Sequence, residues 1–336
     1  MENKRICFYF NPYPEKDRWI KYDRYVRMII RRIVRGKPYT SGIDKVFVNL
    51  KKGLDLLQVP YVVNVPFHRL TPNDQILFMG RGPTWLEKYI KSGKKHPFAA
   101  AIGFSSHPIE IKDIMEGQPL IAYFSHCSWV NDIYAGYFGK DRCLTWPAGV
   151  DTDAYPILPL EQKTTDFLIY RKIRWNVEAE TNRIVEPIRQ VLKKKGFTWK
   201  EIVYLSYKPE QLKELQRTCK ALIFVTEHET QGFALQECMS TGMPVLAWNE
   251  GIVRDPYYGQ CGTLNPPVTA VPFFDETCGR TFTTVESFEN TLDLFWEEFQ
   301  QNKYNPAQFI RNNFTLQKSA EIMCEKLNTV YNKQRL

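Results

Sequence analysis

Short apolar runs alternate with amphipathic stretches along the first half of the chain, and this order predicts parallel strands joined by helices. Runs that are long enough for one buried strand lie at residues 5–10, 61–65, 75–79, 97–102, 120–124 and 143–146. Apolar residues with helical spacing mark a segment that opens at 40–44 and ends near 57, and a shorter one at 128–138. Strands that alternate with helices favour a doubly wound parallel sheet.

The second half of the chain begins the same alternation again. Predicted strands lie at 166–170, 201–205, 221–225 and 245–248, and predicted helices at 177–195, 209–218, 285–301, 306–312 and 315–332. The segment 249–282 is rich in proline and is expected to be irregular. In a chain of 336 residues, two cycles of this pattern predict two domains.

Residues 19–35 are a helix candidate with an unusual basic character. Their apolar stripe has helical spacing, and arginines fill the remaining positions. The stripe is Val26, Ile29, Ile30, Ile33 and Val34, and the arginines are Arg24, Arg27, Arg31, Arg32 and Arg35. We favour a core-facing helix with a solvated basic face. The alternative is a surface that meets anionic lipid or an anionic acceptor.

The segment 221–248 reads as strand, acidic loop, helix and strand. The predicted helix begins at Gly232 and ends at Gly242, because Pro244 cannot continue it. Glu229 lies in the loop, and seven residues separate it from Glu237, which lies in the helix. Both acids can therefore point toward one cleft at the carboxyl edge of the sheet, where open α/β folds bind ligands.

This segment resembles the retaining glycosyltransferases of the family-4 type, whose signature is E-x7-E. The matching residues are Glu229, Gly232-Phe233-Ala234-Leu235 and Glu237-Cys238-Met239-Ser240-Thr241-Gly242-Met243-Pro244-Val245. One departure is that Gly-Phe-Ala-Leu lies two residues later after Glu229 than in the commonest form. The resemblance implies the GT-B fold, in which two Rossmann-like, doubly wound parallel-sheet domains face a cleft. It also implies metal-independent transfer of a sugar from a nucleotide-diphosphate sugar to a glycan or lipid-linked glycan.

The expected domain junction lies at 146–153. This segment resembles the family's P-x-G-V-D motif, which ends the first domain. Asp151-Thr152-Asp153 also fits the D-x-D metal motif of the other main glycosyltransferase fold, but the prolines that follow favour a junction. We therefore expect a first domain at 1–150 on the acceptor side and a donor domain at 151–314. A final helix at 315–336 should return to the first domain, as the resemblance implies.

Cations that follow the first strand of the second half are candidates for the leaving diphosphate. Its negative charge grows as the glycosidic bond breaks, so a positive group there favours the transition state. The resemblance relates this segment to the family's G-R-L-x-x-x-K-G motif, although Tyr170 replaces the glycine. We expect Arg171 and Lys172 to be catalytic, with Arg174 as an alternative donor-binding cation.

The remaining donor contacts are expected around the same helix. Its first backbone amides, at Phe233, Ala234 and Leu235 after Gly232, can donate to phosphate or sugar oxygens. The resemblance gives Glu237 the ribose hydroxyls. It gives Glu229 a hydroxyl of the donor sugar, together with stabilisation of the cationic transition state.

Three further residues have weaker placements. Tyr207 follows another predicted strand and is a candidate for the nucleotide base. The glycine turn at Ser41 and Gly42 opens a helix and resembles the family's acceptor-side loop. We give His126 and His228 no role as a base.

Composition narrows the class of protein further. Apolar residues make up 43% of the chain and charged residues 24%, as in globular proteins. The eight cysteines show no metal-ligand spacing, so we expect reduced thiols and no metal or other cofactor. Neither a signal peptide nor an apolar run of membrane-spanning length is found, which predicts a cytoplasmic protein, peripheral at most to a membrane.

Two other function classes stay open. One is a catalytically inactive subunit, which would keep Glu237 and the helix-end amides and bind a sugar nucleotide without transferring it. The other is a nucleic-acid-binding protein, suggested by the net charge of +8. We rank it last because the basic stretch lacks interleaved exposed aromatics and any known binding module. The expected partners are therefore a nucleotide-diphosphate sugar and a carbohydrate acceptor, without nucleic acid.

Overall fold

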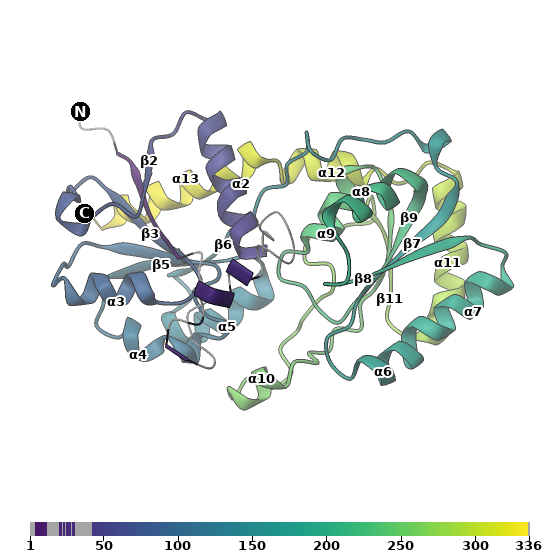
Figure 1. Ribbon diagram of the computed structural model, residues 1–336, viewed down its shortest axis with the longest axis horizontal. Helices are drawn as coiled ribbons and strands as arrows, with labels where there is room; N and C mark the ends of the chain where they lie inside the picture. The colour runs from purple at the N-terminus through teal and green to yellow at the C-terminus, as the bar shows by residue number, and fades with distance from the viewer. Residues whose placement is uncertain are drawn as a thin grey trace. The chain divides into compact units, whose positions relative to one another are not determined.

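The computed structural model describes residues 4–11, 20–21, 23, 25–27, 29–30 and 42–334. The chain divides into two compact units (Figure 1). The first consists of Met1–Gly149 and Leu316–Leu336, and the second of Val150–Thr315. The chain therefore passes into the second unit after Gly149 and returns to the first at its C-terminal helix.

The first unit is built on a parallel six-stranded sheet in the order β2-β1-β3-β4-β5-β6. Its strands are β1 (Ile6–Asn11), β2 (Tyr61–Val63), β3 (Gln75–Gly80), β4 (Phe98–Ala101), β5 (Leu120–Ser125) and β6 (Cys143–Thr145). In register, Phe8 lies opposite both Val63 and Leu77. The neighbouring interior strands β1 and β3 are buried almost throughout, in agreement with their continuous apolar runs.

Helices surround this sheet. They are α2 (Gly42–Leu56), α3 (Thr84–Lys91), α4 (Lys112–Met115), α5 (Ser128–Phe138) and the returning α13 (Leu316–Lys333), with short 3₁₀ turns η1 (Phe67–Arg69) and η2 (Pro108–Glu110). A ring cluster of Tyr9, Phe78, Tyr89 and Phe98 fills one side of the sheet.

The helix α13 is bound to the first unit by specific contacts as well as by packing. The Tyr331 hydroxyl bonds the backbone N–H of Ile76 at 2.6 Å and the carbonyls of Ile76 and Pro97 at 3.0 and 2.9 Å. Where α13 crosses α2, a Cβ on Gly53 would lie 2.2 Å from the Leu316 carbonyl oxygen. Glycine is therefore required at position 53 for the two backbones to approach.

The second unit has a parallel five-stranded sheet in the order β11-β10-β9-β7-β8. Its strands are β7 (Thr165–Lys172), β8 (Trp199–Val203), β9 (Cys219–Thr226), β10 (Val245–Trp248) and β11 (Gly279–Phe282). Alternate side chains of the central strand β9 enter two cores on opposite faces of the sheet. Leu222 and Phe224 face one core, and Ile223 and Val225 face the other.

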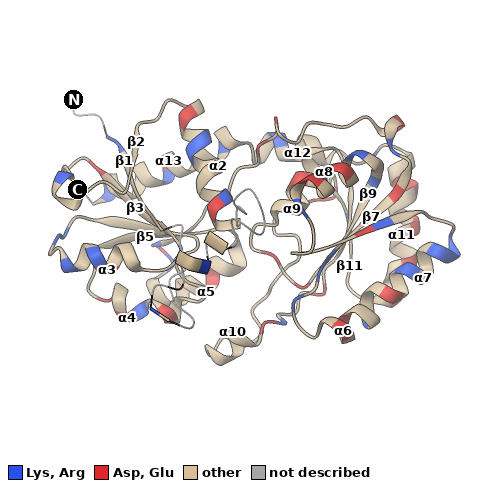
Figure 2. Ribbon diagram, in the orientation of Figure 1, with Lys and Arg blue, Asp and Glu red and all other residues tan. Residues whose placement is uncertain are grey.

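Helices cover both faces of this sheet. They are α6 (Val177–Glu180), α7 (Glu186–Lys194), α8 (Pro209–Thr218), α9 (Phe233–Ser240), α10 (Pro256–Gln260), α11 (Val285–Gln300) and α12 (Pro306–Asn313), with a 3₁₀ turn η3 (Leu160–Gln162). The helix α7 carries charges of both signs, whereas α11 carries acids without a lysine or arginine (Figure 2). Lys194 of α7 pairs with Glu289 of α11 at 2.9 Å, so the two helices are joined by an ion pair.

The parallel α/β architecture predicted for both halves is confirmed, with local corrections. The helix expected at 177–195 is interrupted by a π-helical turn, η4 (Thr181–Val185). The strand expected at 201–205 is β8, which ends at Val203 because the chain turns at Leu205 with φ of 66°. Strand β11 lies in the segment expected to be irregular, since its Gly-Arg-Thr-Phe sequence carries no apolar run.

The core-facing interpretation of the basic stretch is wrong for the residues that are described. Residues 23, 25–27 and 29–30 are helical, yet Val26, Ile29 and Ile30 are 54%, 54% and 52% exposed. Asp23 and Arg27 instead form a largely shielded ion pair at 3.2 Å. The remaining members of the stripe and of its basic face, Arg24 and 31–35, lie outside the described residues. Among the helices that the structure does describe, none is long and apolar enough to cross a membrane.

Candidate functional site

The carboxyl ends of β7 and β9 bring a lysine next to an acidic loop. The two strands are parallel neighbours, and Lys172 at the end of β7 lies opposite Thr226 at the end of β9. The Lys172 ammonium contacts the Glu229 carboxylate at 2.5 Å, and both side chains are largely shielded from solvent. Two of the residues expected to be catalytic therefore meet at this edge of the second sheet.

The surroundings of the Lys172–Glu229 pair strengthen the attraction between the two charges. The Lys172 ammonium also lies 4.7 Å from the centre of the Tyr204 ring, a favourable cation–π position. The backbone N–H of Glu229 donates to the Thr269 carbonyl at 2.9 Å, which anchors the loop. A charge pair held in such a partly dry site interacts more strongly than one in bulk water.

Arg171 is directed away from this pair. Neighbouring residues of a strand point to opposite faces of the sheet, so Arg171 and Lys172 diverge. The Arg171 guanidinium lies 3.2 Å from Glu201 and donates to the Thr181 hydroxyl at 3.1 Å. The structure therefore joins Lys172, but not Arg171, to Glu229.

Arg174 lies closer to the acidic loop than Arg171 does. Its guanidinium is 3.6 Å from the Glu227 carboxylate and 3.3 Å from the His228 carbonyl, and it covers the Trp175 ring at 4.1 Å. Sequence reasoning missed Glu227, and the only available signal was its position two residues before Glu229. Burial raises the pKa of Glu227 despite the hydrogen bonds and cation that favour its charged form.

His228 is buried beside Arg174 and Trp175. Its ring stacks on Trp175 with centroids 5.3 Å apart and planes 11° apart. Burial, with smaller contributions from Arg174 and Lys172, lowers the pKa of His228 to about 3. The imidazole is therefore neutral at physiological pH and carries no charge into the site.

The N-terminus of α9 follows the acidic loop. Gly232 caps it with φ of 72° and ψ of 49°, a left-handed conformation that glycine adopts without strain. The first turn consists of Phe233, Ala234 and Leu235, as expected, and its backbone N–H groups point back toward the loop. Glu237 lies one turn further along α9 and is 4% exposed. Gln231 and Gln236, both buried, are joined by a hydrogen bond at 2.7 Å.

The weaker placements have separate outcomes. The Tyr207 hydroxyl bonds that of Tyr170 at 2.9 Å, so it is held at the edge of the core. Burial, followed by the neighbouring Tyr207, raises the pKa of Tyr170. Gly42 begins α2 in the first unit with open space around it, whereas Ser41 lies outside the described residues.

The junction segment forms a turn. The Asp151 carboxylate accepts the backbone N–H of Ala154 at 3.1 Å, and Val150 bridges to Thr315 where the chain leaves the second unit. Within the described residues, no group of three histidine, cysteine or acidic side chains is arranged to hold a metal ion.

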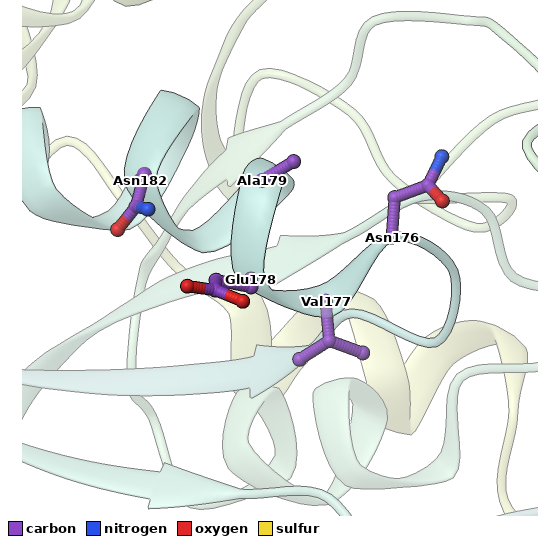
Figure 3. A pocket seen from close by; sticks show the side chains of 5 residues that line it. All are labelled: Asn176, Val177, Glu178, Ala179 and Asn182. Atoms are coloured by element: carbon purple, nitrogen blue, oxygen red, sulfur yellow. The ribbon is translucent and has the colours of Figure 1, made fainter.

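A surface hollow lies beside the start of α6 (Figure 3). It is lined by Asn176, Val177, Glu178, Ala179 and Asn182, and none of these is an expected donor contact. Because it lacks cations and paired titratable groups, we give this hollow no chemistry.

Comparison with known proteins places the fold. No protein-family model matches the chain, and no curated protein matches it. Among solved structures, AviGT4, a glycosyltransferase involved in avilamycin A biosynthesis, matches with a TM-score of 0.52 and 13% identity over 98% of each chain. The S. aureus TarM G117R mutant, in complex with fondaparinux, alpha-GlcNAc-glycerol and UDP, matches with a TM-score of 0.51 and 13% identity. That match covers 78% of this chain and 56% of TarM. The likeness establishes the fold, namely the two Rossmann-like parallel-sheet domains of GT-B glycosyltransferases.

Proposed function

We propose that the chain is a retaining, metal-independent glycosyltransferase of the family-4 type that uses a nucleotide-diphosphate sugar. The observation that carries this proposal is the pair of Lys172 and Glu229 beside the N-terminus of α9. It brings a cation, a carboxylate and a helix N-terminus to one sheet edge, and all three are useful to a donor whose leaving group is anionic.

Each group has a role in the proposed reaction. As the bond from the sugar to the diphosphate breaks, Lys172 and the α9 amides stabilise the growing charge on the phosphate oxygens. Glu237 accepts the ribose hydroxyls, and Glu229 orients a sugar hydroxyl and stabilises positive charge at the sugar carbon. The acceptor hydroxyl then bonds that carbon from the same side and passes its proton to the leaving phosphate. No side-chain base is needed, which agrees with the neutral, enclosed His228.

A thermal-shift screen with UDP-, GDP-, ADP- and TDP-sugars tests the donor class. A nucleotide sugar at a hundred times its Kd should stabilise the fold by about 2.7 kcal/mol. Transfer to a glycan acceptor is then measured with the nucleotide that binds. If no nucleotide sugar shifts the melting temperature, the proposal fails at its first step.

Metal independence is tested with EDTA. If Asp151-Thr152-Asp153 serves only as the turn that the structure describes, turnover in EDTA should equal turnover without it. Activity that disappears in EDTA and returns with Mn²⁺ would contradict this part of the proposal.

A catalytically inactive sugar-nucleotide-binding subunit is the second candidate. The observation that favours it is the engagement of Arg171 by Glu201 and Thr181, which leaves fewer cations near the acidic loop than expected. Such a subunit would be stabilised by a nucleotide sugar, yet neither hydrolyse nor transfer it with any acceptor.

We also propose a peripheral contact with an anionic membrane and a cytoplasmic location. The exposed Val26, Ile29 and Ile30 support the contact, and it would suit a lipid-linked acceptor. All eight cysteines lie in the described part of the chain and are free thiols, as a reducing compartment would keep them.

A further inference from the structure

The acid Glu227 is closer to full burial than any of the proposed donor-binding acids, yet no donor contact is proposed for it. Its carboxylate has no exposed surface, whereas that of Glu229, two residues later, keeps 8%. Burying a carboxylate is costly unless hydrogen bonds and an opposite charge compensate for it. The free-energy cost of burying the Glu227 carboxylate next to the proposed donor site therefore requires a physical explanation.

The compensating partners of Glu227 all come from one short segment, the turn between β7 and α6. The carboxylate accepts the backbone N–H of Arg174 at 3.0 and 3.2 Å and that of Trp175 at 3.1 Å. Two successive N–H groups directed at one anion form a nest, an arrangement that otherwise binds phosphate or sulfate. The Arg174 guanidinium, 3.6 Å away, adds an opposite charge.

This nest determines the path of the chain directly after Lys172. Only Ile173 separates Lys172 from Arg174, and Asn176 closes the turn in a left-handed conformation with φ of 47°. The carboxylate thus ties the turn that follows β7 to the loop that follows β9, close to the place where Lys172 meets Glu229. A displacement of about 1 Å at reacting groups can reduce a rate a hundredfold.

We propose that Glu227 is a positioning residue, which holds Lys172 and Glu229 in register through the backbone N–H groups of Arg174 and Trp175. This inference rests on the proposed function, because its kinetic consequence requires Lys172 to face the leaving diphosphate. Glu227 itself touches neither the donor nor the acceptor.

The variant Glu227→Gln tests this role. A glutamine keeps the size of the side chain, but it offers one acceptor oxygen, no charge and an amide donor that opposes the backbone N–H groups. We expect the turnover number to fall at least tenfold while the KM for the donor changes less than threefold. Glu227→Asp keeps the charge and should recover part of the lost rate.

A matched control is Glu298→Gln. Glu298 accepts hydrogen bonds from Arg280 and from the Tyr304 hydroxyl, both at 2.6 Å, on the helix α11. The variant Glu298→Gln removes an ion pair from the same unit, and it should leave the turnover number within twofold of that of the parent. Equal losses of turnover in the two variants, or an unchanged turnover number in Glu227→Gln, would overturn the positioning role.

Hydrogen exchange separates this inference from the proposed function. In the ligand-free parent, the amides of Arg174 and Trp175 should be protected, and both Glu227 variants should speed their exchange at least tenfold. If the parent transfers no sugar but the variants show this faster exchange, the function is wrong while the tie between the two loops stands. If exchange at these amides is the same in all proteins, the tie itself is wrong, whatever the activity.

Discussion

At the scale of single residues, the site depends on which face of a strand each side chain occupies. The sequence indicates that Arg171 and Lys172 are both cations at a strand end, but their consecutive positions place them on opposite faces. Lys172 meets Glu229, and Arg171 meets Glu201. The two cations should therefore differ in their effect on catalysis.

For Lys172→Ala we expect a large loss of turnover, because this cation would stabilise charge that develops only in the transition state. The loss should be about 2.7–4 kcal/mol in activation free energy, or roughly a hundred- to a thousandfold in rate. Arg171→Ala should lower the melting temperature and reduce turnover much less. Steady-state kinetics and thermal melts of both variants measure the difference. If Arg171→Ala lost more turnover than Lys172→Ala, Arg171 would be the residue that stabilises the leaving diphosphate.

For Glu237→Ala we expect weaker binding of a nucleoside diphosphate, since two charge-assisted hydrogen bonds to the ribose are lost. The expected loss is on the order of 1.5–3 kcal/mol, measured by calorimetry with the nucleotide identified in the screen. Glu237 is buried on α9, so the melting temperature of the ligand-free variant is recorded as well. Unchanged affinity in a folded variant would remove Glu237 from the ribose role.

The residues of the site differ in how well sequence can reveal them. Glu229 and Glu237 stand out because their chemistry and spacing occur within one local motif. Glu227 does not, because its function depends on the N–H groups of a turn more than fifty residues earlier in the chain. The pairing of Lys172 with Glu229 likewise depends on the register of β7 against β9, which no local pattern encodes.

At the scale of elements, the sequence predicts the strands better than it predicts what the apolar face of a helix packs against. A short, continuous apolar run favours a buried strand, and β3 and β5 are such strands, buried at every position. The spacing of Val26, Ile29 and Ile30 correctly indicates a helix, but spacing alone does not say whether the apolar face meets a core. Here it does not, and the exposed face leads to a prediction about lipid.

We expect the parent protein to bind vesicles that contain anionic lipid and to release them at high salt. Residues 20–37 carry seven basic residues and one acid, so charge attraction adds to apolar insertion. Exchanging Ile29 and Ile30 together for asparagine should lower vesicle partitioning about tenfold or more. Flotation with neutral and anionic vesicles measures this effect.

The matched control for vesicle binding is Leu264→Asn. Leu264 is 81% exposed in the second unit, and its loss should leave partitioning unchanged. If the double variant binds as well as the parent, or if the parent ignores anionic vesicles, this helix has no lipid-binding role.

At the scale of the whole molecule, each unit contains a histidine that is held neutral. Burial lowers the pKa of His126, in the first unit, and of His228, in the second, to about 3. The unfolded chain binds a proton at each position near pH 6.5, whereas the folded chain does not. The stability that these histidines confer is thus present above pH 6.5 and is lost as the pH falls toward 3.

Between pH 7 and pH 5.5, each histidine should reduce the free energy of unfolding by about 1 kcal/mol. Glu227 acts in the opposite sense, because its pKa is raised in the fold. Denaturant unfolding at the two pH values measures the net loss, and His126→Gln or His228→Gln should make it smaller. A loss in either variant that is as large as the loss in the parent would contradict the prediction.

The return of α13 to the first unit has a consequence for protein synthesis. Gly53 packs against Leu316, and the Ile76 backbone bonds Tyr331. Because both partners belong to α13, the first unit cannot complete its core until the second unit has been synthesised. At about 5–20 residues per second, the interval is roughly ten to forty seconds. The second unit, Val150–Thr315, is contiguous and can fold as soon as it leaves the ribosome. The half translated first should therefore be the last to become native, and during that interval its apolar strands are the part of the molecule that chaperones would protect.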